Sequence, residues 1–97
     1  MTYPIRPPLL AALLVLLAGP AAAACYADYR AQTSDPFGLH YGVIEIPESA
    51  CTEAAAAPVV AERIAAEGWE LLELISVFDE AGLEPRRSDA GAYFLRY

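Results

Sequence analysis

The sequence predicts a small α+β domain, in which an antiparallel sheet of about four strands carries one helix on one face, after a cleaved leader. The order of elements is strand-strand-helix-strand-strand. Two observations lead to this prediction: four apolar, aromatic-rich segments have strand-like patterns, and an alanine-rich segment with helical spacing separates the second from the third. A glycine, Gly68, then joins the helical segment to Trp69. We expect the other elements to pack around this joint.

Residues 1–24 are predicted to be a secretory signal peptide. Arg6 precedes an unbroken apolar run from Leu9 to Ala18, which Pro20 and the small residues 22–24 follow. A transmembrane helix needs about 20 apolar residues, and this run is shorter. We therefore expect a periplasmic or secreted bacterial protein without a membrane span, whose residues 25–97 form one domain.

The charge of the mature chain restricts its partners. Loss of Arg6 leaves five arginines, no lysine and 13 acidic residues, a net charge of −8. Such an acidic surface repels phosphate backbones and anionic membranes, so we expect no nucleic-acid binding.

The first two strands are predicted to form an antiparallel hairpin. Residues 26–32 alternate loosely in polarity, and Pro36 and Gly38 lie in the turn that follows. The second strand spans residues 39–46, and Pro47 ends it.

A helix is predicted from Glu53 to Glu67. Thr52 is suited to cap it, and Pro58 either kinks this helix or begins a shorter one. Val60 and Ile64 form a narrow apolar stripe. Gly68 fits the left-handed position after the helix, which would bury Trp69 against Ile64.

The third strand, Trp69 to Phe78, has large apolar residues on both faces. Either a bulge near Leu72 and Glu73 changes the register, or both faces are covered. Residues 79–91 are predicted to be a polar hairpin connection, and residues 92–97 a short final strand.

Residues 65–72, Ala-Ala-Glu-Gly-Trp-Glu-Leu-Leu, follow a short helix, and Tyr-Phe-Leu-Arg at 93–96 lies near the end of the chain. With these features, Val59 to Tyr97 resembles the small bacterial domains of unknown function numbered 4177. The leader and the cysteine pair are departures from that family. The resemblance implies the helix-on-sheet fold and no activity.

Cys25 and Cys51 are the only cysteines, and the hairpin brings them near one another. An exported chain favours a disulfide between them. The alternative is a lipid anchor on Cys25, for which Ala22 stands where leucine is usual.

The sequence predicts no enzyme, cofactor or metal site. His40 is the only histidine, and no hydroxyl lies in a recognisable nucleophile setting. The acidic residues in 79–91 lack the spacing of a calcium loop.

Tyrosines on the predicted strands suggest a contact surface, because one helix covers only one sheet face. The candidate interaction residues are Tyr26, Tyr41, Leu72, Leu74, Tyr93 and Tyr97. We therefore expect a non-enzymatic exported domain that binds a protein partner or forms a homodimer, sheet face on sheet face. The alternatives are an acidic inhibitor of a basic exported enzyme and, less favoured, a small ligand-binding enzyme.

Overall fold

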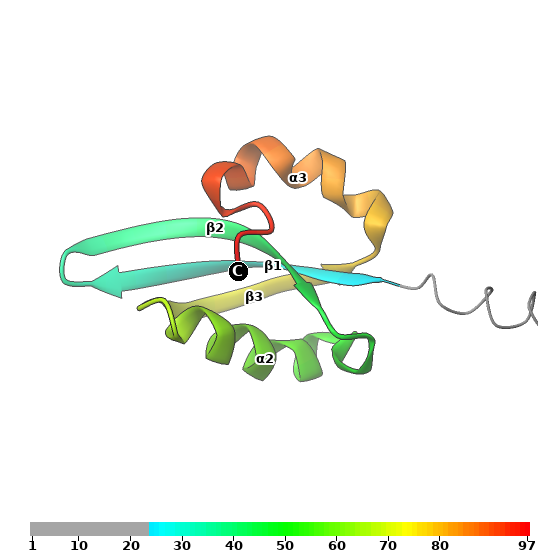
Figure 1. The fold of residues 1–97 in the computed structure, drawn as a ribbon, viewed down its shortest axis with the longest axis horizontal. Helices are drawn as coiled ribbons and strands as arrows, with labels where there is room; N and C mark the ends of the chain where they lie inside the picture. The colour runs from blue at the N-terminus through cyan, green and yellow to red at the C-terminus, as the bar shows by residue number, and fades with distance from the viewer. Residues whose placement is uncertain (1–23) are drawn as a thin grey trace, which may run out of the picture.

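The computed structural model describes residues 24–97, so residues 1–23 of the predicted leader lie outside the described part. Within that part the fold is α+β, with an antiparallel sheet of three strands in the order β2-β1-β3. One helix, α2, lies on one side of the sheet, and a second helix, α3, lies on the other (Figure 1). The elements are β1 (Cys25–Ser34), β2 (Phe37–Ile46), η2 (Glu48–Ala50), α2 (Glu53–Ala65), β3 (Glu70–Phe78), η3 (Glu80–Gly82), α3 (Leu83–Ala90) and η4 (Gly91–Tyr93).

The predicted β1–β2 hairpin is confirmed, and it is longer than expected. Its register runs from Cys25 opposite Ile46 to Ser34 opposite Phe37, with only two residues in the turn. Because side chains alternate along a strand, Ala27, Tyr29 and Ala31 of β1 share one face, and all three are fully buried beneath α2.

The glycine at position 42 is required by its neighbour across the hairpin. Gly42 lies opposite Tyr29, and a Cβ at Gly42 would come within 2.5 Å of the Tyr29 hydroxyl oxygen. The absence of a side chain therefore leaves room for the largest fully buried side chain of the core.

Helix α2 begins at Glu53, as predicted, and Pro58 lies inside it. The Thr52 side chain caps the helix by accepting a hydrogen bond from the Ala55 amide at 3.1 Å. Ala56, Val60 and Ile64, spaced four apart, are the buried residues that face the sheet.

The joint after α2 has the predicted geometry. Gly68 has a φ of 87°, in the left-handed region. The Gly68 amide donates to the Ala65 carbonyl at 3.0 Å, and the Trp69 amide donates to the Ile64 carbonyl at 3.1 Å. These two bonds define a Schellman ending. Trp69 packs against the cluster that contains Ile64, although its side chain is half-buried rather than largely buried.

Two β-bulges resolve the mixed pattern of β3. The pairing with β1 shifts between Arg30 and Ala31 and again between Asp28 and Tyr29, so Leu72 and Ile75 become the extra residues. The shifts place Leu71, Leu74 and Val77 together against the α2 core. Of the two alternatives that the sequence left open, the structure has the bulge near Leu72 and Glu73, and the two separate apolar rows, on which the expected sheet-face dimer rested, do not form.

The prediction of four strands and a single helix is wrong for the described residues. The segment expected to be a hairpin connection contains η3 and α3 instead. The Asp79 side chain accepts the Ala81 amide at 3.1 Å, which starts the helical turns. Pro85 and the two glycines favoured a turn in the sequence, but Pro85 lies in the first turn of α3, where proline is tolerated.

The predicted final strand is reduced to one bridge. Phe94 pairs with Val43 of β2, in parallel rather than antiparallel orientation. Helix α3 returns the chain alongside β2, and Leu95 then takes a φ of 55°, which ends the extended backbone. A longer fourth strand cannot continue past that residue.

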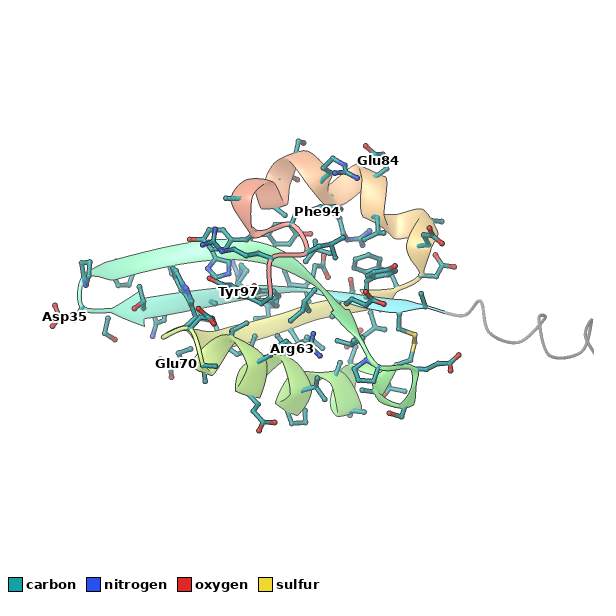
Figure 2. All side chains as sticks on the ribbon, viewed as in Figure 1. Asp35, Arg63, Glu70, Glu84, Phe94 and Tyr97 are labelled. Carbon is teal, nitrogen blue, oxygen red and sulfur yellow. A yellow bond between two sulfur atoms is a disulfide. The ribbon has the colours of Figure 1, made fainter. Side chains whose placement is uncertain are left out.

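The structure contains the predicted disulfide between Cys25 and Cys51. Their Cα atoms are 5.8 Å apart and the bond closes a separation of 26 residues. It joins the start of β1 to the loop before α2, so it fastens the helix to the sheet at one end (Figure 2).

Replacement of Gly68 by alanine is expected to lower the free energy of unfolding by about 1 kcal/mol, because a Cβ is unfavourable at this positive φ. Gly68→Asn is the matched control, since asparagine tolerates the left-handed region and should cost less. Thermal or denaturant unfolding of the oxidised mature chain measures both. Equal stability of Gly68→Ala and wild type would contradict this assignment.

Loss of the disulfide is expected to cost roughly 3.5 kcal/mol, the chain-entropy value for a loop of this length. The measurement compares unfolding of the mature chain with that of the Cys25→Ala/Cys51→Ala double variant. Non-reducing mass spectrometry should first show the wild type two hydrogens lighter than its reduced form. Two free thiols, or a diacylglyceryl adduct on Cys25, would refute the pairing.

Candidate functional site

A buried carboxylate lies at the centre of the sheet face opposite α2. Asp28 of β1 is only 4% exposed. It accepts hydrogen bonds from the Ser76 hydroxyl at 2.6 Å, the Tyr41 hydroxyl at 2.8 Å and the Arg86 Nε at 2.9 Å. The three donors come from β3, β2 and α3, so this one side chain connects all three elements to the central strand.

Arg86 holds α3 against this face. Besides its ion pair with Asp28, its Nη1 donates to the Gly82 carbonyl at 2.8 Å, and its guanidinium lies 4.0 Å from the centroid of the Phe78 ring. Burial raises the pKa of Asp28, but the hydrogen bonds from Ser76, Arg86 and Tyr41 outweigh burial and hold that pKa below the ordinary value of 3.8. Burial and the neighbouring Asp28 raise the pKa of Tyr41 to about 12.

Helix α3 covers only the half of this face that contains Asp28. The β1–β2 hairpin extends beyond it toward the turn at Asp35 (Figure 2). Strand alternation places Arg30 and Tyr41, which pair in register, on the same face as Asp28 but nearer the turn. We call this uncovered region the open half-face; it consists of Arg30, Phe37, Leu39, Tyr41 and Leu72.

The open half-face is apolar and contains a shallow hollow. Phe37, Leu39 and Leu72 are 68%, 62% and 48% exposed. The hollow has a volume of about 420 Å³. It is lined by Arg30, Ala31, Leu39, His40, Tyr41 and Leu72.

Polar contacts border the open half-face along β3. Arg30 forms an exposed ion pair with Glu73, and the Gln32 amide nitrogen donates to the Glu70 carboxylate at 3.0 Å. An apolar centre with a polar border is the arrangement found at protein–protein contact sites.

The six predicted interaction residues do not form one surface. Tyr41 and Leu72 line the hollow. Leu74 packs in the α2 core, and Tyr26 stacks with Phe78 at a centroid distance of 6.1 Å, near the covered half. Tyr93 and Tyr97 lie next to His40, at the β2 edge of the sheet. Their grouping on one face is therefore wrong, because α3 and the bulges separate them.

His40 is part of an aromatic cluster at the edge of β2. Its ring stacks on Tyr93 at 3.7 Å and meets Trp69 edge-on at 4.3 Å, and its Nε2 lies 2.9 Å from the Tyr29 hydroxyl. Burial, followed by the nearby charge of Arg96, lowers the pKa of His40 below 6.5. Burial also raises the pKa of Tyr29. Although His40 lies on an edge strand, the residue is only 8% exposed.

Sequence reasoning missed Asp28 and Arg86, which are 58 residues apart in the chain. The only available signal was a carboxylate in the middle of a strand, between Ala27 and Tyr29. It also missed Phe37, because the second strand was expected to begin at Leu39, and it did not select Leu39 as a contact residue although the residue lay in that strand.

Within residues 24–97, no group of three or more histidine, cysteine or acidic side chains is placed to hold a metal ion. None of the helices in this range is long and apolar enough to cross a membrane. Comparisons with protein-family models, with curated proteins and with solved structures find no match for this chain.

Asp28→Asn is expected to destabilise the fold by roughly 3 kcal/mol at neutral pH, because it leaves Arg86 without its charge partner. Glu73→Gln is the control: it breaks an exposed ion pair and should cost less than about 1 kcal/mol. Denaturant unfolding measures both variants.

The difference between wild type and Asp28→Asn should also depend on pH. Because the pKa of Asp28 is lowered on folding, its stabilisation is complete above the unfolded value of 3.8 and is lost as the pH falls through the folded pKa. The two stabilities should therefore converge in acid. A difference that stays constant down to acid pH would contradict this role of the carboxylate.

Proposed function

We propose that the protein is an exported, non-enzymatic interaction module that binds a protein partner, or a second copy of itself, through the open half-face. The observation that carries this proposal is the exposure of large apolar side chains on the open half-face: Leu39 and Leu72, which line the hollow, and Phe37, which lies nearer the hairpin turn. Apolar groups gathered on one surface favour a contact with another protein, since their burial stabilises the complex.

The surroundings of the hollow support recognition rather than chemistry. The hydroxyl of Tyr41 is fixed by Asp28, so its ring is held in one position before any partner binds. A side chain ordered in advance loses little conformational entropy on binding. The buried titratable groups already have partners: Asp28 accepts hydrogen bonds from Ser76, Tyr41 and Arg86, and the His40 Nε2 is engaged with the Tyr29 hydroxyl.

The cysteine pair and the predicted leader support export. A disulfide persists in oxidising compartments, such as the periplasm or the extracellular space. The resemblance of Val59 to Tyr97 to the domains of unknown function numbered 4177 stays a prediction, and it adds no activity to this proposal.

A homodimer is no longer required to cover a whole sheet face. We expected one apolar face of the sheet to be left without a cover, but α3 covers half of that face. A second copy is therefore one candidate for the open half-face alone, and a different protein is the other.

Leu39→Glu and Leu72→Glu are expected to abolish binding, because each places a charge in the apolar centre. Leu95→Glu is the matched control, since Leu95 is also exposed, at 43%, but lies outside the open half-face. Sedimentation of the oxidised mature chain at micromolar concentration tests self-association. Capture from the exported fraction, with each variant as bait, tests a different partner.

A complex that is lost in both half-face variants and retained in Leu95→Glu supports the proposal. A chain that forms no complex in either experiment, or a complex that is insensitive to Leu39→Glu and Leu72→Glu, refutes it.

The second candidate function, inhibition of a basic exported enzyme, is favoured by the shape of the hairpin. The β1–β3 pairing ends at Gln32, so the hairpin tip projects beyond the sheet with Phe37 exposed on it. Such a tip suits insertion into a cleft, and the net charge suits a basic target. Salt distinguishes the two functions: a charge-driven complex weakens as ionic strength rises, whereas an apolar contact does not.

A further inference from the structure

The last residues of the chain follow the outer edge of β2. Beyond the Phe94–Val43 bridge, the Leu95 amide donates to the Val43 carbonyl at 2.8 Å. Figure 2 shows Phe94 beneath α3 and Tyr97 nearer the middle of the molecule, so the segment descends past β2. We call residues 93–97 the terminal segment. One bridge and a set of ring contacts hold it, and a leucine at positive φ lies in its middle.

The ring contacts centre on His40. The Tyr93 ring lies nearly parallel to the imidazole, with an interplanar angle of 12° and a centroid distance of 3.7 Å, and the Tyr97 centroid is 6.2 Å away. The imidazole Nε2 is engaged with the Tyr29 hydroxyl. The Nδ1 atom is buried and has no hydrogen-bond partner.

The neutral ring fits this environment better than the charged ring. In the neutral tautomer whose Nε2–H donates to the Tyr29 oxygen, Nδ1 carries no hydrogen and no N–H is unpaired. Protonation would make both nitrogens donors, and Nδ1 has no acceptor within reach, so a buried N–H would stay unpaired. The groups that face the ring are Tyr29 from β1 and Tyr93, Arg96 and Tyr97 from the terminal segment; Trp69, from the joint after α2, is uncharged. Among the described residues no carboxylate bonds to the imidazole.

Two effects of protonation oppose one another. An imidazolium stacked on aromatic rings is stabilised by cation–π attraction. Burial of the charge and the repulsion from Arg96 act against it, and they prevail, since the pKa of His40 is lowered on balance. Detachment of the terminal segment would expose the ring to water and remove Arg96 from it.

We propose that His40 is a pH-sensitive latch for the terminal segment, in which the neutral ring holds Tyr93–Tyr97 against β2 and protonation releases them. The release is local. Helix α2 keeps its contacts with the sheet through Val60 and Ile64 and remains fastened by the disulfide. The latch acts at the β2 edge, beside the hollow that His40 helps to line.

The direction of the pH dependence follows from linkage. Docking of the segment adds to the burial of the ring and brings Arg96 near it, and both effects lower the pKa of His40 below its ordinary value of 6.5. The docked form is therefore favoured above that value, and its advantage is lost as the pH falls toward the docked pKa. Each unit by which docking lowers the pKa corresponds to about a tenfold change in the docking equilibrium.

Hydrogen exchange of the Leu95 amide in the oxidised mature chain tests the latch. Between about pH 7.5 and about pH 5, its protection, corrected for the intrinsic exchange rate, should fall about tenfold per unit of lowered pKa. The Ala56 amide, bonded to the Thr52 carbonyl at 2.8 Å in α2, is the internal control and should keep its protection. Because His40 is the only histidine, its ring signals report its own titration by NMR.

Two variants separate the latch from general acid destabilisation. His40→Gln cannot titrate, so the protection of Leu95 should become independent of pH over this range. Arg96→Gln removes one cause of the lowered pKa, so its pH dependence should be shallower than that of wild type. If His40→Gln does not fold, the pH dependence of Leu95 protection in Arg96→Gln still tests the proposal. Constant protection of Leu95 in wild type, or a fall of equal size in Ala56, or an unchanged pH dependence in the variants, overturns the proposal.

Discussion

The carboxylate of Asp28 determines how the second face of the sheet is used. A three-stranded sheet with one helix would leave that face exposed to water, and its central strand carries a buried charge there. A buried charge is tolerated only when it is paired and hydrogen-bonded. Arg86 meets this requirement, and it brings α3 with it. The helix has few apolar residues of its own, so this contact and the Phe78 ring account for its position.

The placement of α3 has two consequences for function. It leaves the hairpin end of the sheet uncovered, which creates the open half-face with Leu39 and Leu72. It also returns the chain beside β2, where the terminal segment covers His40. The candidate contact surface and the candidate pH-sensitive element therefore adjoin at His40, which lines the hollow and is covered by the terminal segment, and both follow from the same ion pair.

The two edge strands of the sheet, β2 and β3, are protected from pairing with another chain in different ways. The edge at β2 is covered by the terminal segment and by Arg63, whose Nη1 donates to the Glu45 carbonyl at 2.7 Å. The edge at β3 has no paired strand among the described residues, but it carries two bulges and the charges of Glu70 and Glu73. Bulges and charges discourage pairing with another chain. A partner is therefore more compatible with the open half-face than with this edge.

The sequence by itself determined the local structure: the hairpin turn, the Thr52 cap, the left-handed glycine at position 68 and the pairing of Cys25 with Cys51. These features depend on neighbouring residues, on turn and cap chemistry, or on there being only two cysteines. Only the tertiary structure decided the second face. Residues 79–91 lack an apolar stripe, so their helix depends on Asp28, 58 residues before Arg86. Likewise, the predicted tyrosine surface was divided by α3 and by the register of β3, because alternation along one strand cannot show what packs above it.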